Sequence, residues 1–289
     1  MRLEPGEIEG DRGRLTQGPQ PAFLRLINRT TTGPEGSPQT LSLKRVLGSR
    51  EVLLEGSIPK LGRPWSGEVA APEPALFATT LLSEALIRRG ITVDGGVLAS
   101  RDTLPQDLRP LASVRGPGIV EQIRIVNKES QNLHTEMLLR WLGAQAKGEG
   151  SAEMGHAAVE DFLRRIGVPA DSWALQDGSG LSRSDLVTAH GMAALLAAME
   201  RHRYAAAFRD SLPVAGVDGT LATRMEQPAL RGKVVAKTGT IRHVNALGGY
   251  VTARSGQRFV FYAAVNHHPG PSSDSVAALD AIAALLAAQ

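Results

Sequence analysis

The sequence contains no cysteine, which excludes disulfide bonds and cysteine-ligated metal sites. It also lacks a long hydrophobic run: its most apolar stretch, residues 277–288, is rich in alanine and interrupted by Asp280, so no membrane span is expected. No lysine- or arginine-rich run occurs, so the net charge of +3 does not indicate a nucleic-acid partner. No histidine spacing indicates zinc, and no metal or cofactor is expected. The residues after Met1 have no apolar core and are not a signal peptide.

A chain of 289 residues with 42% hydrophobic content can bury a sizeable core, and its length predicts one large domain or two smaller ones. Residues 1–115 are expected to be β-rich with one helix, which Gly90 closes, and residues 48–50 are expected to form a hairpin turn. The segment 101–117 contains three prolines and marks the boundary with a second unit, 116–289. The strand-like runs cover residues 23–28, 41–47 and 51–58, and the helix covers residues 74–90.

Residues 116–289 show helical patterns, then three strand-like runs, then an amphipathic C-terminal helix, an order typical of a layered α+β fold. Thr188 is the candidate N-cap of the third helix, and Ser272 or Ser273 that of the last. The helical patterns cover residues 133–142, 156–169, 188–202 and 272–288, and the strand-like runs cover 233–238, 244–253 and 258–266. The first helix is expected to turn one apolar face inward, formed by Leu133, Met137, Leu138, Trp141 and Leu142.

Two short segments carry reactive side chains. Residues 237–239, Lys-Thr-Gly, end the strand-like run 233–238, and a glycine in such a run often marks the close approach of a ligand. This segment offers a cation, a hydroxyl and open backbone, which suit a ligand with a carboxylate and an amide. Residues 130–132, Ser-Gln-Asn, place a hydroxyl and an amide at the start of a helix. Each segment also has an ordinary explanation, since the first can arise by chance and serine and asparagine commonly cap helices.

Together the two segments follow the chain order of the motifs in penicillin-binding proteins and β-lactamases. Four blocks within residues 130–251 extend the match, and they read "SQNLHTEMLLRWLG", "LQDGSGLSRSDLVTAHGMAALLAAM", "LPVAGVDGTLATRM" and "VAKTGTIRHVNALGGYV". All four resemble the D-alanyl-D-alanine carboxypeptidase/endopeptidase family of low-molecular-mass penicillin-binding proteins. The stretch "LLSEALIRRGITVDGG" and the strands before it resemble that family's large insert. The resemblance therefore covers most of the chain.

The resemblance implies an α+β fold: a penicillin-recognising transpeptidase/β-lactamase-like domain, with an antiparallel sheet flanked by helices, plus a β-rich insert domain. Residues 1–115 would be the C-terminal part of the insert, and residues 116–289 the C-terminal part of an N-terminally incomplete catalytic domain. The implied reaction releases D-alanine from a peptidoglycan stem peptide, or cuts a peptide cross-link, through a serine ester. The implied ligands are peptidoglycan stem peptides and β-lactam antibiotics, and the implied location is periplasmic or extracytoplasmic.

Residue roles follow from the same resemblance. Ser130 would relay a proton to the leaving amine, and Asn132 would bond the peptide amide of the substrate. Lys237 would hold positive potential over the site and keep Ser130 activated. The implied substrate-binding groups are the side chain of Thr238 for the terminal carboxylate, Gly239 for close approach of the substrate to the strand, and the backbone N–H of Thr240 for half of an oxyanion hole.

The nucleophile of the family is the serine of a Ser-x-x-Lys helix. The only such pattern in this sequence starts at Ser57 and ends at Lys60, after a strand-like run and before a glycine-rich segment without helical period. We interpret it as a strand end with a turn. The expectation is that the chain begins part-way through the insert and lacks the nucleophile segment. Apolar groups should then be exposed on the sheet face opposite the C-terminal helix.

Three further segments have ordinary interpretations. Residues 177–180 and 218–220 are read as turns, although the first could approach the substrate, and residues 267–268 are read as histidines in a solvated loop. A serine β-lactamase on the same fold is disfavoured by the long region before Ser130. A non-catalytic peptidoglycan-binding or interaction module, which keeps the groove without the nucleophile, is the alternative from another class.

Overall fold

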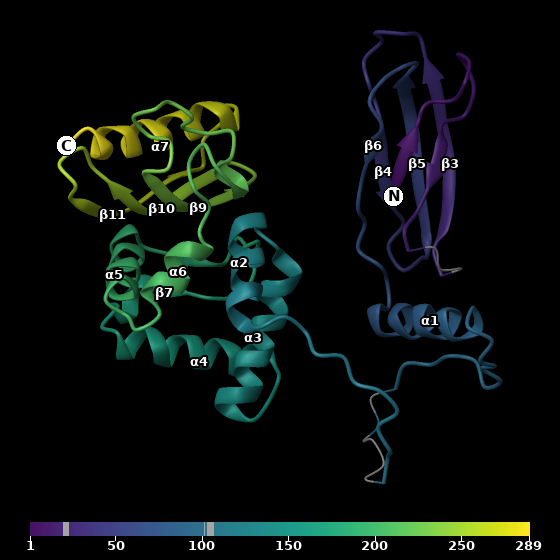
Figure 1. Ribbon diagram of the computed structural model, residues 1–289, viewed down its shortest axis with the longest axis horizontal. Coiled ribbons are helices and arrows are strands. Elements are labelled where there is room, and N and C mark those ends of the chain that lie inside the picture. Colours follow the sequence, from purple (N-terminus) through teal and green to yellow (C-terminus); the bar gives the residue numbers. More distant parts are fainter. Residues whose placement is uncertain (20–22, 101, 103–106) are drawn as a thin grey trace. The chain divides into compact units, whose positions relative to one another are not determined.

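The computed structural model describes residues 1–19, 23–100, 102 and 107–289 and divides the chain into two compact units, residues 1–111 and 112–289 (Figure 1). The division falls within the expected boundary segment 101–117, of which residues 101 and 103–106 lie outside the described residues. The assignment of the units to an insert and to a catalytic domain stays a prediction.

The first unit contains two three-stranded sheets and one helix. In one sheet β5 pairs parallel with β3 and antiparallel with β4, which confirms the predicted hairpin around residues 48–50. Leu54 and Ile58 of β5 pack with Leu3 in a small core, because alternate residues of a strand face the same side. The elements are β1 (Arg2–Glu4), β2 (Arg14–Thr16), β3 (Arg25–Gly33), β4 (Ser42–Arg45), β5 (Glu51–Pro59), β6 (Trp65–Ser66) and α1 (Pro74–Ile87).

The second unit contains the remaining helices and a three-stranded antiparallel sheet. Thr188 caps α5 as predicted, since its side chain accepts the backbone N–H of Gly191. Ser272 is the first residue of α7 rather than its cap, and the helices α2 and α6 were not predicted. The elements are α2 (Ile119–Glu129), α3 (Asn132–Lys147), α4 (Ala152–Arg165), η1 (Ala170–Ser172), β7 (Trp173–Ala174), β8 (Leu186–Val187), α5 (Ala189–Glu200), α6 (Ala205–Ser211), η2 (Gly219–Leu221), β9 (Val234–Ile241), β10 (Val244–Thr252), β11 (Arg258–Asn266) and α7 (Ser272–Ala287).

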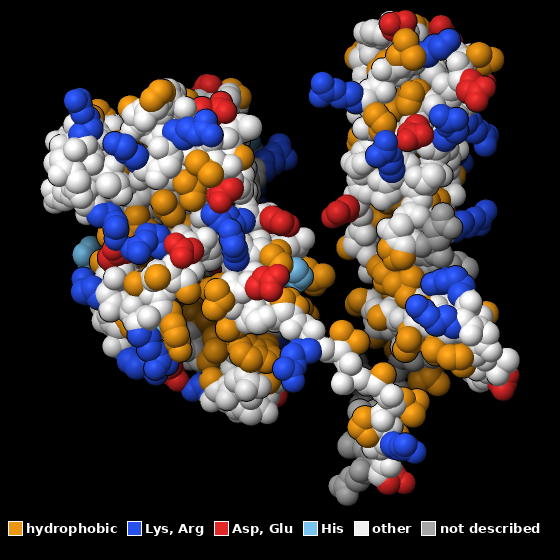
Figure 2. Space-filling view, viewed as in Figure 1, with side chains coloured by type: hydrophobic (Ala, Val, Ile, Leu, Met, Phe, Trp, Pro, Cys, Tyr) orange, Lys and Arg blue, Asp and Glu red, His pale blue; other side chains and the backbone are white. Residues whose placement is uncertain are grey.

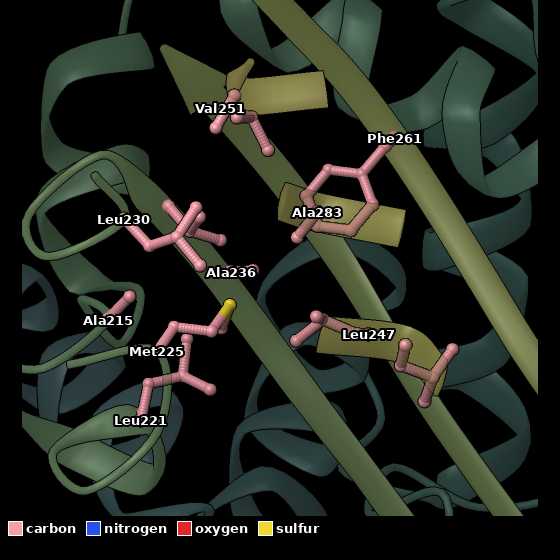
Figure 3. Packing of buried hydrophobic residues seen from close by; sticks show 12 residues of the cluster. Ala215, Leu221, Met225, Leu230, Ala236, Leu247, Val251, Phe261 and Ala283 are labelled. Carbon is pink, nitrogen blue, oxygen red and sulfur yellow. The ribbon is translucent and has the colours of Figure 1, made fainter. Parts of the chain in front are cut away.

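The central sheet has the order β11-β10-β9, and α7 covers one of its faces (Figure 1). This confirms the predicted antiparallel strands and covering helix. Alternate strand residues, among them Val234, Leu247 and Val251, are fully buried under α7 with Leu279 and Ala283. Figure 3 shows these strands and helix contributing side chains to one continuous cluster, which residues 215–230 close at its edge.

The opposite sheet face differs from the prediction. Helix α5 packs against β11 and β10 on that face, where Leu196 and Tyr250 are buried and the hydroxyl of Tyr250 donates to the backbone oxygen of Leu196. Burial, with a contribution from Glu200, raises the pKa of Tyr250 to about 12. The expected exposed apolar face is therefore not found over these two strands.

Exposed apolar side chains lie instead on α3. Leu133, Met137 and Trp141, spaced four residues apart, have exposed fractions of 68%, 57% and 52%, and Figure 2 shows hydrophobic side chains reaching the surface around this helix. Their predicted burial is wrong because α4 packs on another side of α3. There the backbones approach so closely that a side chain on Gly155 would lie 2.3 Å from the backbone oxygen of Leu139.

Candidate functional site

A pocket of about 360 Å³ in the second unit lies where the α2–α3 junction meets β9. The structure brings all six residues of the proposed site to this pocket. Its hydrophobic lining residues are Val126, Leu181 and Ile241, and the other lining residues are polar or glycine. The lining residues used below are Ser130, Asn132, Gly178, Lys237, Thr238, Gly239 and Thr240.

Ser130 lies on the turn that joins α2 to α3. Its backbone is left-handed, with φ of 57°, and its N–H donates to the backbone oxygen of Val126, which ends α2. Such a conformation is uncommon for a residue other than glycine, and residues of this kind concentrate at active sites. Asn132 follows as the first residue of α3 and lines the same pocket. The turn therefore presents the hydroxyl and the amide together, as the spacing of the motif suggested.

Lys237 bridges the two walls of the pocket. Its Nζ donates to Ser130 Oγ at 2.9 Å and to the backbone oxygen of Thr238 at 2.8 Å, although Ser130 is 107 residues away in sequence. Burial lowers the pKa of Lys237, because removal of water disfavours the charged form. The ammonium group is therefore held at the junction of the two motifs by a hydroxyl and a carbonyl rather than by a carboxylate.

The strand β9 continues through the whole Lys-Thr-Gly-Thr segment to Ile241, beyond the predicted end at residue 238. Ala236 donates its backbone N–H to Pro213, on the side away from β10. Alternate residues of an antiparallel strand direct their peptide groups to the same edge, so Thr238 and Thr240 also direct theirs away from β10. The site is thus a strand edge along which an extended ligand can lie.

The side chain of Thr240 is held by a series of hydrogen bonds that could not be predicted from the sequence. Asn245, which is 1% exposed, donates to Thr240 Oγ1 at 3.2 Å, and Asn245 Oδ1 lies 3.0 Å from Nε2 of His268. His268 lies in the loop after β11, as interpreted from sequence, but it is half-buried beside Asn245 rather than fully solvated. His267 is exposed, as expected.

Residues 178–180 of the segment 177–180 line the pocket, so its interpretation as an ordinary turn was incomplete. Glu136 of α3 accepts the backbone N–H groups of Gly178 at 2.9 Å and Ser179 at 3.1 Å, and also bonds Arg140. Burial alone would raise the pKa of Glu136, but these hydrogen bonds lower it on balance. The loop is thereby tied to the same helix that begins with Asn132.

A partly buried carboxylate at the base of this loop, that of Asp185, predicts that stability depends on pH. Asp185 accepts the N–H of Gln176 at 2.6 Å, while its Oδ2 is buried with no partner among the described residues. Burial, with a contribution from the neighbouring Asp177, raises the pKa of Asp185. A folded-state pKa above the unfolded value of about 3.9 means that stability is lost as the pH rises through the folded pKa.

We therefore expect Asp185→Asn, which keeps the acceptor oxygen and adds a donor for Asp177, to raise the melting temperature at pH 7.5. The advantage over wild type should shrink as the pH falls towards 4, because protonation of Asp185 removes the same charge as the substitution. Thermal unfolding at a series of pH values measures both. An equal or lower melting temperature for the variant at pH 7.5 would show that the charge is not destabilising.

The Ser-x-x-Lys pattern at Ser57 has no helical geometry. Ser57 lies on β5, so Ser57 and Lys60 do not share a helical turn. Lys60 follows the strand and donates its backbone N–H to the backbone oxygen of Gly33 at 2.9 Å. The sequence-based interpretation as a strand end is confirmed. In the described part of the chain no group of three or more acidic or histidine residues could hold a metal ion, and no helix is long and apolar enough to cross a membrane.

Comparison with known proteins identifies the fold and the family. The structure of penicillin-binding protein 4 (dacB) from Haemophilus influenzae, complexed with a β-lactam, matches with a TM-score of 0.77 at 24% identity, covering 99% of this chain and 67% of that chain. This likeness confirms the predicted penicillin-recognising α+β fold. A D-alanyl-D-alanine carboxypeptidase from Actinomadura sp. (strain R39) is 38% identical over 285 residues, covering 96% of this chain and 52% of that protein.

A further relative, the D-alanyl-D-alanine carboxypeptidase DacB from Haemophilus influenzae, is 28% identical over 216 residues, covering 74% of this chain and 45% of that protein. The chain thus spans about half the length of these two relatives. The model of the D-Ala-D-Ala carboxypeptidase 3 (S13) family matches residues 1–288. With this match over nearly its whole length, the chain belongs to the D-Ala-D-Ala carboxypeptidase 3 (S13) family.

Proposed function

We propose that this chain supplies the accessory half of the catalytic site of a serine-type D-Ala-D-Ala carboxypeptidase or endopeptidase that acts on peptidoglycan stem peptides. The observation that carries the proposal is the 2.9 Å contact between Lys237 Nζ and Ser130 Oγ, beside the open edge of β9. This contact brings the two motifs within the hydrogen-bonding reach that proton transfer between them would need. Because peptidoglycan lies outside the cytoplasmic membrane, the proposed location is periplasmic or extracytoplasmic.

The geometry supports a distinct role for each group. Lys237 places positive charge against the hydroxyl of Ser130, which favours proton transfer through Ser130 to the leaving amine. An extended peptide along β9 can reach the amide of Asn132 from one side and the edge of the strand from the other. The N–H of Thr240 is directed to this edge, where it can stabilise a developing oxyanion. The side chain of Thr238 is the proposed binder of the terminal carboxylate.

Gly239 supports the idea that the strand edge receives a ligand. Its φ is not in the left-handed region, and an added Cβ would meet only Ala246 Cβ, at an ordinary contact distance of 3.5 Å. The fold itself therefore does not require glycine at this position. A requirement for glycine would come from a molecule that lies against the strand.

We expect Gly239→Ala to leave the melting temperature close to that of wild type but to weaken binding of a D-Ala-D-Ala peptide at least tenfold, because the new methyl group projects from the exposed part of the strand. Thermal unfolding and ligand titration measure the two effects. A suitable control is Gly249→Ala on β10, whose Cβ would lie 2.3 Å from the backbone oxygen of Val235 and which should destabilise the fold. Unchanged binding by the Gly239 variant would argue against a ligand along β9.

The nucleophile in this proposal is the serine of a Ser-x-x-Lys helix that is not among these 289 residues. Ser57 lies on a strand, and the matches cover only 52% and 45% of the two relatives. The exposed stripe on α3, formed by Leu133, Met137 and Trp141, offers apolar surface for such a helix to cover. In this proposal the catalytic site has two parts. This chain provides the groove that binds the substrate, and a further segment provides the nucleophile.

The test is a titration of the 289-residue protein with N-acetyl-D-Ala-D-Ala, followed by nuclear magnetic resonance of the backbone amides. Shifts confined to the Ser130 turn and to residues 237–240 are the expected result. When a segment carrying Ser-x-x-Lys is joined to the chain, release of D-alanine should appear. Binding at the groove without turnover in the joined protein would favour a non-catalytic module, and shifts elsewhere would overturn the assignment of the site.

A further inference from the structure

The loop between α6 and β9, residues 212–233, touches the Lys-Thr-Gly strand along the part of its edge that precedes the motif. Ala215 donates its N–H to Val234, and Ala236 donates to Pro213, both at 2.9 Å. These bonds occupy the edge of β9 up to Ala236. At the point where the edge becomes open, Thr220 Oγ1 lies 2.8 Å from Thr238 Oγ1. The segment 218–220, interpreted from sequence as a turn, therefore touches the proposed carboxylate-binding side chain.

Either threonine can donate in this contact, so the Thr238 hydroxyl can donate to a ligand when Thr220 donates to it. A hydroxyl has one proton and two lone pairs, whereas a carboxylate can only accept. If Thr238 gives its proton to a ligand carboxylate, its oxygen can still accept one from Thr220. Donation from Thr220 also polarises the Thr238 hydroxyl towards the ligand, because linked hydrogen bonds strengthen each other. Thr220 itself does not line the pocket, so it acts through Thr238.

A second contact fixes the same loop to the opposite wall of the pocket. Lys128 Nζ donates to both carboxylate oxygens of Asp218 at 2.7 Å, and Asp218 Oδ1 also accepts the N–H of Val214 at 2.9 Å. The Lys128 side chain is 12% exposed and the Asp218 side chain 38%, so water reaches this pair mainly from the carboxylate side. Lys128 is two residues before Ser130, at the end of α2. Asp218 thus links the Ser130 turn to the loop that holds Thr220.

Gly219 allows these two contacts to coexist. Its φ is 59°, and an added Cβ would lie 2.8 Å from the backbone oxygen of Lys128. The backbone of the loop is therefore in direct contact with α2 at this residue, with Asp218 bonded on one side of it and Thr220 directed to β9 on the other. A larger residue would separate the loop from α2 and move Thr220 away from Thr238.

We propose that Thr220 is a positioning residue for recognition of a free C-terminal carboxylate, and that the Lys128–Asp218 pair holds it in place. The proposal rests on the function proposed above and adds a specificity element to it. Thr220 orients the Thr238 hydroxyl as a donor, which favours a ligand that ends in a carboxylate over one that ends in an amide. The ion pair fixes the position of the Ser130 turn relative to the Thr238 hydroxyl.

The experiment compares two probes, N-acetyl-D-Ala-D-Ala and its C-terminal amide, in titrations of the 289-residue protein. Thr220→Val removes the hydroxyl at nearly constant shape, Thr220→Ser restores it, and Thr223→Val removes an exposed hydroxyl further along the same loop. We expect Thr220→Val to weaken binding of the free acid about tenfold and to leave binding of the amide unchanged. Thr220→Ser and Thr223→Val should both behave like wild type. Melting temperatures verify that each variant is folded.

The ion pair is tested with Asp218→Asn, which keeps one acceptor oxygen but removes the charge that Lys128 neutralises. This variant should weaken binding of the acid more than binding of the amide, and the backbone amide resonances of Ser130 and Thr238 should both shift. If wild type prefers the acid but Thr220→Val binds it equally well, the inference is wrong and the proposed function stands. If wild type binds neither probe, or does not prefer the acid, the proposed function fails and the inference fails with it.

Discussion

Incubation of the 289-residue protein with a fluorescent penicillin is expected to give no covalent adduct. Acylation needs a nucleophilic hydroxyl with an adjacent base, and the Ser57–Lys60 pattern has the geometry of a strand end instead of a helix. The groups that remain, Lys237 and Thr238, are proposed to bind a carboxylate but do not by themselves form the ester. Intact-mass measurement after incubation is the direct test.

The same labelling experiment has three informative outcomes. Labelling that appears only when a segment bearing Ser-x-x-Lys is joined to the chain would support the proposed division of the site. A stoichiometric adduct on the 289-residue protein that maps to Ser130 would make this serine the nucleophile, with Lys237 as its base at 2.9 Å. An adduct at Ser57 would show that the strand end is reactive and that the interpretation of β5 is wrong.

In the protein joined to its nucleophile segment, Lys237→Ala is expected to lower the rate of acylation by penicillin by about 10²–10⁴-fold. Loss of a positioned proton-transfer or electrostatic group has effects of this size, and Ser130 would lose the donor that polarises its hydroxyl. Lys233→Ala is the matched control, because it removes the same charge just before β9 begins. A rate within a few-fold of wild type for Lys237→Ala would remove this residue from the mechanism.

The pH dependence provides a second readout of Lys237. Burial lowers its pKa, so the ammonium form is lost at a lower pH than for an ordinary lysine, which titrates at about 10.4. The alkaline fall in acylation rate should therefore begin below that value. Lys237→Arg keeps its charge to higher pH, and any activity that it retains should fall later. An unchanged alkaline limb in the arginine variant would assign the limb to another group.

The antiparallel sheet and its covering helix were predictable because their signals are local. Valine, isoleucine and phenylalanine favour strands. The short turn at residues 254–257 connects β10 directly to β11, so the two strands pair as antiparallel neighbours. The Thr188 cap needs only the N–H of Gly191, three residues away. By contrast, α2 was missed although Ile119, Ile123 and Val126 recur at helical spacing, because its isoleucines and valines are β-branched residues that favour strands.

The face of α3 was wrongly predicted because apolar periodicity shows which residues could be buried but not where the neighbouring helix lies. Helix α4 approaches where Gly143 and Gly155 allow the two backbones to meet, since an added Cβ on Gly143 would lie 2.7 Å from the backbone nitrogen of Gly155. Glycine contributes nothing to a hydrophobic pattern, so the closest contact between these helices leaves no signal in the periodicity. Met137 and Trp141 consequently face solvent.

The sequence by itself determined the chemistry of the site, since the motifs that contain Ser130, Asn132 and Lys237 specify a hydroxyl, an amide and a cation. It also determined that the cation lies on a strand and the hydroxyl beside a helix. Only the tertiary structure placed Lys237 against Ser130 and Thr220 against Thr238, across 107 and 18 residues. The physical reason is that strand and helix preferences depend on near neighbours, whereas the groove depends on which distant elements bury surface against each other.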